Sequence, residues 1–464
     1  MLNDRTYGDV PPAGIPWHHT GRQTRTSPVR MLVSGYFAVT LLFTFLLMLP
    51  VSSQQHGRQS FIDAFFMACS GISTTGLAVV DIGSYYSLFG QFVLMLDFQV
   101  GGIGYMAFTV VLVLLFGMNL SMKNRSVAAE SIAGAGFGQI FYFFKRVLLF
   151  TLFIELASGL ILFLFWMSKF PMLKALYYGL FHSISAFCTA GFSLFPDSLV
   201  SYKDSLLVNL TINLTSLIGG IGFLVMSELF DQGKKLLKKQ GHLTVSVNSR
   251  LALVMTTVVI LSGTAVIFLS EKWPSEMGIE ERFRDSSFQS ISASTTDGFN
   301  TVDIGAMAPA SLLVIIFLMF TGASPCSTGG GIKTTTLGVI LLTLWSKIRG
   351  KKDSNCFWRR IPDELSTKAF VIFQLYLMIL LADWFVLTLT ENQGSLQILF
   401  EIASALGNTG LSTGITSHLS GLGKMTLALT MFAGRVGPLT LGLALMEDGT
   451  AGGFRNAKAE ILVG

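Results

Sequence analysis

The chain has 464 residues, of which 51% are hydrophobic and 13% charged, and its mean hydropathy is +0.61. Soluble domains carry about 25% charged residues, so this composition excludes an ordinary soluble protein and indicates a polytopic membrane protein. The formal net charge is +5 at pH 7, but in a membrane protein the positions of the basic residues matter more than their sum.

The N-terminal segment 1–29 is polar and lacks the short apolar run and small-residue cleavage site of a secretory signal, so we expect it to remain as a tail. Eight apolar spans follow, each long enough to cross the hydrocarbon core. They come in four pairs, at 31–50 and 88–117, 147–168 and 205–227, 251–270 and 311–345, and 369–389 and 424–446.

A shorter apolar stretch lies between the two spans of each pair. A helix of about 12 residues rises only about 18 Å, so each stretch must enter and leave the membrane on the same side. We therefore expect an all-α polytopic membrane protein with eight crossings and four re-entrant segments.

One motif recurs in every pair. Its four copies are FMACSGISTTGL from Phe66, FHSISAFCTAGF from Phe181, FQSISASTTDGF from Phe288 and FEIASALGNTGL from Phe400. Each copy has Ser four residues after the Phe and Gly ten residues after it, and these glycines are Gly76, Gly191, Gly298 and Gly410. The pattern predicts four pseudo-repeats, at 30–117, 147–227, 251–345 and 369–446, and a C-terminal tail at 447–464.

The basic residues predict the orientation. With both tails in the cytoplasm, the cytoplasmic segments hold 22 Lys and Arg and the outer segments hold eight. The positive-inside rule then places all four re-entrant segments outside a cell (inner) membrane. Two basic residues, Lys333 and Arg435, fall inside spans, where a charge costs at least a few kcal/mol and marks a functional candidate.

Four re-entrant loops at membrane depth must surround one central pore, because unpaired backbone is tolerated only where it is buried or lines water. A ring of carbonyl oxygens can replace the hydration shell of a cation. Each motif Gly permits positive φ and leaves space open, and each short helix directs the partial negative charge of its C-terminal end toward the pore. The arrangement predicts cation coordination without catalysis.

This organisation resembles the superfamily of potassium transporters that contains KtrB, TrkH and the plant HKT proteins, and eight spans look most like KtrB. The resemblance covers residues 30 to 446. It implies potassium uptake through a selectivity filter, with potassium selectivity accompanying Gly in all four repeats. It also implies potassium binding by the carbonyls just before each Gly, which are those of Thr74, Thr75, Thr189, Ala190, Thr296, Asp297, Asn408 and Thr409.

Asp297 is the acid among the four residues that directly precede a motif Gly. It could raise the local occupancy of cations, or its side chain could form hydrogen bonds behind the filter. We favour the second interpretation because buried carboxylates are usually hydrogen-bonded.

The second span of the third repeat contains Gly322, Pro325 and the run Gly329, Gly330 and Gly331. Such a sequence cannot continue as a helix, so we expect two half-helices joined by a loop over 322–336 that includes Lys333. The resemblance implies that this loop gates the pore; close helix packing is the alternative. It is not a phosphate-binding loop, because Ile332 separates Gly331 from Lys333.

Arg435 lies in the last span and must face the pore or an acid. The resemblance implies that it obstructs the pore below the filter, whereas an ion pair with Asp97 is the simpler interpretation, and both can hold together. Asp63 and Glu401 are interpreted as charges that complement the N-terminal ends of short helices near the outer surface. Glu155 and Asp383 remain without an explanation.

Two other function classes fit less well. A transporter with inverted repeats would place its repeats in opposite orientations, and a membrane enzyme would need a nucleotide motif or a cluster of His or Cys. The four cysteines predict neither a disulfide framework nor a metal site, and no cofactor is expected beyond potassium, with sodium as a further candidate ion.

The predicted partners are the lipid bilayer and other protein subunits, with no nucleic acid. Loops of 20 to 30 residues between the spans leave no room for a nucleotide-sensing domain of about 100 residues, so regulation is expected in trans. The resemblance implies a homodimer seated on a separate cytoplasmic ring of nucleotide-binding subunits. The sequence leaves open the dependence on sodium or protons, the transport rate and the identity of the regulatory subunit.

Overall fold

A computed structural model describes residues 28–55, 57–116, 137–238, 245–438, 440 and 442. This part of the chain is mainly helical, and its strands are limited to the antiparallel pair β1 (Asn355–Cys356) and β2 (Arg359–Arg360). The all-α class predicted from the sequence is confirmed. The predicted tail 447–464, and all but the last two residues of the tail 1–29, lie outside the described residues.

Each predicted repeat contains an outer helix, a short pore helix and an inner helix, and these three pack on one another. The first two repeats contain α1 (Pro28–Leu47), α2 (Phe61–Ile72) and α4 (Leu88–Phe116), then α6 (Phe137–Trp166), α7 (Met172–Phe187) and α8 (Leu206–Ile221). The last two contain α10 (Val247–Ser270), α11 (Ile279–Thr295) and α12 (Pro309–Thr321), then α14 (Asp363–Thr390), α15 (Ser395–Gly407) and α16 (Gly421–Val436).

The remaining elements are short or lie at the ends of these helices. They are α3 (Ile82–Tyr85), α9 (Phe223–Leu237), α13 (Thr334–Ile348) and the 3-10 turns Pro50–Ser52, Val200–Tyr202, Ile304–Ala306 and Thr416–His418.

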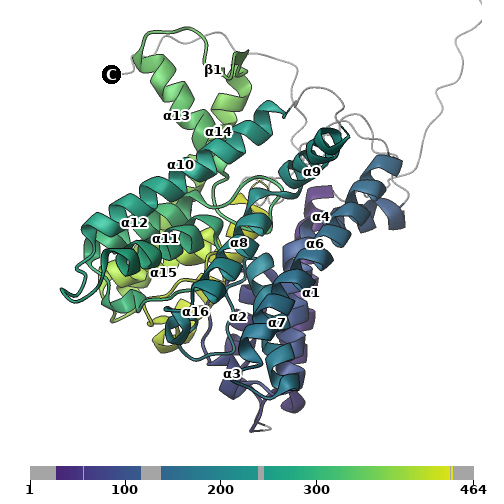
Figure 1. The fold of residues 1–464 in the computed structure, drawn as a ribbon, viewed down its shortest axis with the longest axis vertical. Coiled ribbons are helices and arrows are strands. Elements are labelled where there is room, and N and C mark those ends of the chain that lie inside the picture. The colour runs from purple at the N-terminus through teal and green to yellow at the C-terminus, as the bar shows by residue number, and fades with distance from the viewer. Residues whose placement is uncertain are drawn as a thin grey trace, which may run out of the picture.

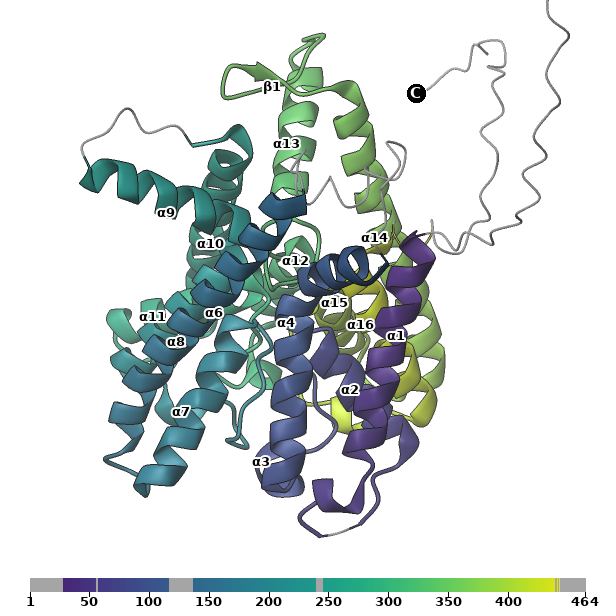
Figure 2. The ribbon, with the colours of Figure 1, turned by 90° about the vertical axis from the view of Figure 1, so that its right-hand side faces the viewer.

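The four repeats close into a ring. The inner helix of each repeat packs against the pore helix of the next, which gives the pairs α4 with α7, α8 with α11, α12 with α15, and α16 with α2. The fourth pair returns to the first repeat, so the purple N-terminal helices and the yellow α16 lie together (Figure 2). The four motifs therefore meet in the middle of the bundle.

The pore helices differ in length. α2 and α15 have 12 and 13 residues, as predicted, whereas α7 and α11 have 16 and 17. In α11 the additional N-terminal residues are largely exposed and include the acidic Glu280 and Glu281, so this helix projects beyond the core of the bundle.

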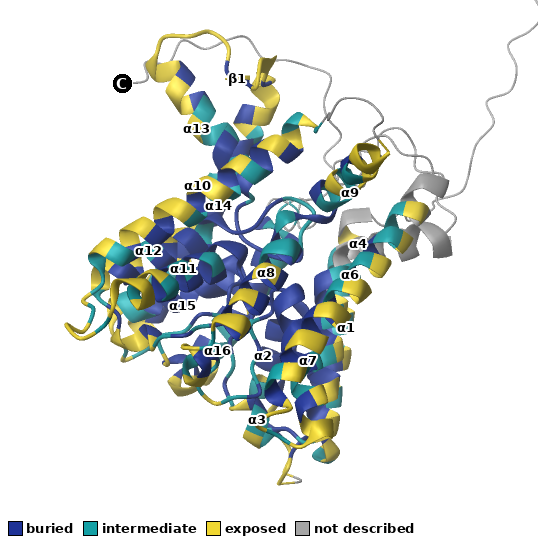
Figure 3. Cartoon of the chain, in the orientation of Figure 1, coloured by how far each residue is buried: buried dark blue, intermediate teal, exposed yellow. Residues whose placement is uncertain are grey.

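The exposed surface is apolar, as a bilayer requires. Large apolar side chains point outward along α6 and α14, for example Phe153 and Leu389, which are 71% and 72% exposed. Burial is concentrated toward the centre of the bundle (Figure 3). A soluble monomer does not expose apolar surface on this scale, so the outer helices face lipid.

Within the described residues, three helical segments are identified as long and apolar enough to cross a membrane unbroken, namely Tyr142–Trp166, Val247–Ser270 and Asp363–Thr390. Of the other predicted spans, α1 and α4 also have the length of a crossing, with 20 and 29 residues, whereas α16 has 16 residues and two spans are broken. The span 311–345 breaks between α12 and α13 as predicted.

The prediction of one continuous span over 205–227 is wrong. α8 and α9 meet at Gly222 and are bent by 100°. Gly222 has φ +99°, and a Cβ there would lie 2.4 Å from the carbonyl oxygen of Pro325. Glycine is therefore needed at the bend both for its positive φ and for the close approach of the third repeat.

The two ends of the bundle differ in their elements. Figure 1 and Figure 2 show α9, α13 and the β1–β2 hairpin at one end, and Figure 2 shows α3 at the opposite end. The described residues of the basic segments 228–250 and 346–368, which are 228–238, 245–250 and 346–368, belong to the end with α9, in agreement with the orientation predicted from the sequence.

Candidate ion-conducting site

The four motif glycines contact one another's repeats in a closed cycle. All have positive φ, between +64° and +92°. A Cβ at each would lie 2.1 to 2.4 Å from the carbonyl oxygen before the next motif glycine. The pairs are Gly76 with Ala190, Gly191 with Asp297, Gly298 with Thr409 and Gly410 with Thr75. Glycine is required because any side chain would collide with the backbone of the adjacent repeat. This reason is more specific than the one given by the sequence, which was that glycine leaves the pore open.

The residue two positions before each glycine is also strained. Thr74, Thr189, Thr296 and Asn408 have φ between +50° and +58°, and all four are fully buried. A non-glycine residue in this left-handed region costs about 1 to 2 kcal/mol. Strain repeated at four equivalent positions indicates a geometry that the surrounding structure holds for a functional purpose.

The recurring Ser of the motif holds the segment that leads to the motif glycine, a role that the sequence did not reveal. The amide of the residue before each glycine donates to the carbonyl oxygen of Ser70, Ser185, Ser292 or Ser404, at 2.8 to 2.9 Å. The hydroxyls of Ser292 and Ser404 also accept from the amides of Gly298 and Gly410, at 3.1 and 3.0 Å. The exact recurrence of Ser four residues after Phe was the available signal.

Asp297 does not show the favoured arrangement. The side chain is fully buried, and neither carboxylate oxygen has a hydrogen-bond partner among the described residues. The nearby Ser216 hydroxyl donates instead to the carbonyl oxygen of Asn213, at 3.2 Å. The predicted hydrogen bond behind the filter is thus not found, while the backbone carbonyl of Asp297 takes its place in the cycle of glycine contacts.

The break in the third repeat forms a closed loop with a narrow neck. Gly322 and Gly331 both have positive φ, and a Cβ on Gly322 would lie 2.7 Å from the Gly331 Cα. The Ala323 amide donates to the Gly330 carbonyl at 3.2 Å. The non-helical segment ends at Lys333, so the last three residues of the predicted loop 322–336 belong to the first turn of α13.

The tip of this loop contacts the residue two positions before the motif glycine in all four repeats. The Thr328 carbonyl accepts from Thr74 Oγ1 at 3.2 Å, and Thr328 Oγ1 accepts from Thr189 Oγ1 at 3.2 Å. The Gly330 amide donates to Thr296 Oγ1 at 3.1 Å, and a Cβ on Gly330 would lie 2.5 Å from Asn408 Oδ1. The loop therefore lies directly against the filter motif.

Two cationic side chains are attached to this loop. Arg435 Nη1 donates to the Thr328 carbonyl, and Nη2 donates to the Gly101 carbonyl of α4 at 2.5 Å. Lys333 Nζ donates to the Gly329 and Gly330 carbonyls at 2.7 and 3.3 Å. Arg435 and Lys333, the two predicted cationic gate residues, thus both bind backbone carbonyl oxygens of the same loop, next to the four glycine motifs.

Asp97 is not hydrogen-bonded to Arg435. The Asp97 side chain is fully buried, and in the described part of the chain neither of its carboxylate oxygens has a hydrogen-bond partner. The carboxylate packs against Gly71, where a Cβ would lie 2.1 Å from Oδ2. The simpler interpretation of Arg435, as the ion-pair partner of Asp97, therefore has no hydrogen bond to support it.

The two acids left unexplained by the sequence join helices. Glu155 of α6 accepts from Gln99 Nε2 of α4 at 3.1 Å, which links the first two repeats. Asp383 of α14 accepts from Thr430 Oγ1 of α16 at 2.6 Å, within the fourth repeat. Both carboxylates therefore accept hydrogen bonds from uncharged side chains where two helices pack together.

Asp63 lies in the first turn of α2, as predicted, and additionally forms a salt bridge of 2.7 Å with Lys424 of α16. The interpretation of Glu401 is wrong. Glu401 is buried in the middle of α15 and accepts hydrogen bonds from Ser412, Thr413 and Thr416, at 2.7 to 3.1 Å. Its carboxylate anchors the segment that follows the Gly410 motif.

Replacing Glu401 by Ala is expected to lower the free energy of unfolding by about 3 kcal/mol, because it leaves several buried donors without their acceptor. The measurement is the thermal unfolding midpoint of the purified chain in detergent. Glu401→Gln should keep most of the stability, and Glu276→Ala at an exposed position is the control. Equal midpoints for Glu401→Ala and Glu276→Ala would contradict this role.

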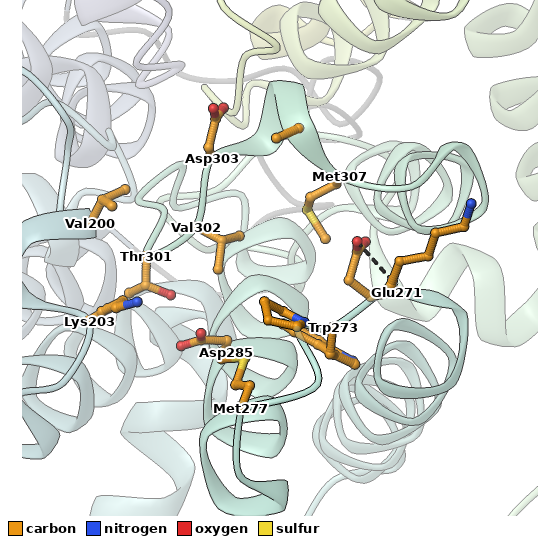
Figure 4. A pocket seen from close by; sticks show the side chains of 13 residues that line it. Val200, Lys203, Glu271, Trp273, Met277, Asp285, Thr301, Val302, Asp303 and Met307 are labelled. Atoms are coloured by element: carbon orange, nitrogen blue, oxygen red, sulfur yellow. Dashed lines mark hydrogen bonds between the residues drawn. The ribbon is translucent and has the colours of Figure 1, made fainter.

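A separate cavity of about 280 Å³ lies where the α10–α11 connection meets the segment after Gly298. Figure 4 shows Asp285, Thr301 and Lys203 on one side of it and Glu271 and Trp273 on another. None of the predicted filter or gate residues lines this cavity, so it is distinct from the site built by the four motifs.

Comparisons with known proteins agree with this architecture. The family model TrkH, described as cation transport protein, matches residues 14–448. The Ktr system potassium uptake protein B of Bacillus subtilis is 38% identical over 420 residues, which cover 90% of this chain and 92% of the relative. The protein of the same name from Vibrio alginolyticus is 35% identical, with 90% of each chain covered.

A further relative, the potassium/sodium uptake protein NtpJ of Enterococcus hirae, is 29% identical over 91% of this chain and 93% of its own. Among solved structures, the potassium transporter TrkH from Vibrio parahaemolyticus matches with a TM-score of 0.68 and 21% identity, over 89% of this chain and 85% of that one, which establishes the shared fold.

These relatives are ion transporters by name and not enzymes, in agreement with the prediction from the sequence. The family model covers nearly the whole chain, and two relatives above 30% identity match over nine tenths of it. The chain therefore belongs to the TrkH family of cation transport proteins.

Proposed function

We propose that this chain takes up potassium across the cell membrane through a filter formed by its four glycine motifs. The observation that carries the proposal is the closed cycle in which each motif glycine meets the carbonyl before the next motif glycine. Such a cycle brings four equivalent backbone segments around one axis, the arrangement that a ring of carbonyl ligands for a dehydrated cation needs. The relatives' names, which specify potassium uptake, support potassium as the ion.

Potassium in this proposal is bound by the carbonyls of Thr74, Thr75 and their equivalents in the other three repeats. The chain is oriented with its filter toward the outside and both tails in the cytoplasm, as the distribution of Lys and Arg supports. Potassium and sodium both appear in the name of one relative, so dependence of the flux on external sodium is a second property to measure.

The direct test is growth. A bacterium that lacks its own potassium uptake should grow at low external potassium when it expresses this chain, together with the regulatory subunit of a Ktr system. An expressed, membrane-inserted chain that does not restore growth, and carries no potassium flux in proteoliposomes, would overturn the proposal. Flux of sodium without potassium would change the assigned ion.

The loop from Gly322 to Lys333 is proposed as the gate, with Arg435 and Lys333 holding it in place. Its contacts with the first filter residue of every repeat support this role, because an ion leaving the filter must pass the same region. A loop that served only to pack helices would not need to reach all four motifs.

Deleting Ser324 to Ser327 is expected to raise potassium flux and to weaken its dependence on the regulatory subunit. The deletion shortens the segment between the neck glycines Gly322 and Gly331, so that Thr328 and Gly330 can no longer reach all four motifs. The measurement is potassium flux into proteoliposomes with and without the regulatory subunit. Folded protein with unchanged or lower flux would contradict gating and favour a packing role for the loop.

Regulation is proposed to come from separate subunits: a homodimer of this chain seated on a cytoplasmic ring of nucleotide-binding subunits. Support comes from the names of the relatives, which describe components of a Ktr system, and from the short segments between the spans. Purification of the chain with the regulatory subunit, followed by measurement of the mass of the complex, tests this assembly.

A further inference from the structure

Helix α9 leaves the bundle sideways. It bends by 100° from α8 at Gly222 and extends from the same end of the molecule as the β1–β2 hairpin (Figure 2). If α8 crosses the membrane, this bend places α9 nearly parallel to the membrane surface. The inference below rests on the orientation proposed above, in which this end faces the cytoplasm.

The apolar residues of α9 lie along one side of the helix. Successive residues are turned by about 100°, which places Val225, Met226, Leu229, Phe230, Leu236 and Leu237 on one arc. The outer members of this arc are strongly exposed: Leu236 is 59% and Leu237 is 87% exposed. Leucines exposed to this extent need an apolar environment that the described chain does not provide.

The acidic residues on the opposite arc are already bound. Asp231 forms a salt bridge of 2.6 Å with Arg146 of α6, and this hydrogen-bonded guanidinium lowers the pKa of the Asp231 carboxyl. Glu228 accepts from the Ser246 amide at 3.1 Å. These contacts attach the polar side of α9 to the bundle and neutralise its acids.

The lysines of α9 are left as an excess of positive charge. Lys234, Lys235 and the C-cap residue Lys238 lie on or beside the polar arc, and no salt bridge to any of them is found within the described residues. Lys234 instead lies over the Phe230 ring, 4.3 Å from its centroid, at the border between the two arcs. A basic edge beside an exposed apolar arc is typical of a helix at a membrane interface.

We propose that α9 is an interfacial helix that lies in the cytoplasmic leaflet, with its leucines among the acyl chains and its three lysines bound to anionic lipid headgroups. A lipid surface fits better than a protein partner, because an exposed apolar arc bordered by lysines matches acyl chains bordered by anionic headgroups. Through Gly222 the helix is joined directly to the gate loop, since the Phe223 amide donates to the Cys326 carbonyl at 2.8 Å.

The location of the helix is tested by photo-crosslinking. A photoreactive amino acid is placed at Leu237, on the apolar arc, or at Glu228, on the polar arc, in the full chain reconstituted in nanodiscs of phosphatidylcholine with phosphatidylglycerol. Position 237 is expected to crosslink to lipid at least several times more than position 228. Crosslinks from position 237 to protein, including the regulatory subunit, or equal lipid crosslinking at both positions, would overturn the proposal.

The role of the lysines is tested with the triple variant Lys234→Gln, Lys235→Gln, Lys238→Gln. The preference for phosphatidylglycerol is measured as the ratio of phosphatidylglycerol to phosphatidylcholine among the lipids crosslinked at position 237. Each lysine near an anionic surface contributes about 1 kcal/mol, so this preference should fall by up to about a hundredfold in the triple variant. Replacing Arg349, Lys351 and Lys352 by Gln removes the same charge beyond α13 and should leave this preference unchanged.

An unchanged preference in the α9 variant would refute headgroup binding. If the triple variant fails to elute as folded protein, Lys235→Gln alone replaces it, with an expected loss of about fivefold. The readout is lipid attachment and not ion flux, so this proposal and the proposed potassium transport can fail independently.

Discussion

Replacing Gly298 by Ser is expected to lower the selectivity for potassium over sodium by about tenfold or more, which corresponds to about 1.4 kcal/mol in relative binding. Gly298 has φ +88°, and the new Cβ would lie 2.2 Å from the Thr409 carbonyl oxygen. The residue can be accommodated only if that carbonyl moves. A displaced ligand in the proposed filter weakens the discrimination between ions of different radius.

The structure offers a matched control for this experiment. Gly414 has φ +93° and no atom within 4 Å of an added Cβ, so Gly414→Ser imposes similar backbone strain without striking a neighbour. Potassium and sodium fluxes into proteoliposomes are measured for both variants, and for the equivalent changes at Gly76, Gly191 and Gly410. Unchanged ion preference in all four motif variants would remove the glycines from the filter.

The second large effect is expected at Arg435. A unit charge about 4 Å from a permeating cation repels it by about 4 kcal/mol at an effective dielectric constant near 20, which is up to a thousandfold in rate. Arg435→Ala removes this charge and also the hydrogen bonds to the Thr328 and Gly101 carbonyls. Both losses favour an open pore, so the maximal potassium flux should rise.

A set of variants separates three possible roles of Arg435: its positive charge, its hydrogen bonds to the backbone carbonyls and its pairing with Asp97. Arg435→Lys keeps the charge but cannot make both hydrogen bonds of the guanidinium, so it should raise the flux less than Arg435→Ala. If the main role of Arg435 is to neutralise Asp97, Arg435→Ala should instead lose stability, and Asp97→Asn should restore it in the double variant. Unchanged flux in a stable Arg435→Ala protein would refute the barrier.

Much of the fold follows from local sequence. The apolar spans indicate helices in lipid, and the glycines around Pro325 show that the helix of the third repeat must break, because neither residue type supports a continuous helix there. The recurrence of Phe, Ser and Gly indicates four equivalent segments. These features depend on residues close together in the chain, so they can be read without knowing the tertiary structure.

The errors arise where a distant segment decides the conformation. Gly222 lies in an apolar stretch that suits a continuous helix, yet the chain bends there, at a point where the carbonyl of Pro325 leaves no room for a side chain. Glu401 looked like a helix N-terminal charge, but it is placed deeper in α15 and binds the segment after Gly410. Its partners are 11 to 15 residues away, beyond the range of helix periodicity.

The sequence by itself determined the class of protein, the four repeats, the positions of the motif glycines and the break in the third repeat, because hydropathy, glycine and proline act locally. Only the tertiary structure decided which repeat contacts which, that Thr328 and Gly330 reach all four motifs, and that Arg435 binds carbonyl oxygens. Those contacts join residues up to several hundred positions apart, and their geometry depends on how the four repeats close into a ring.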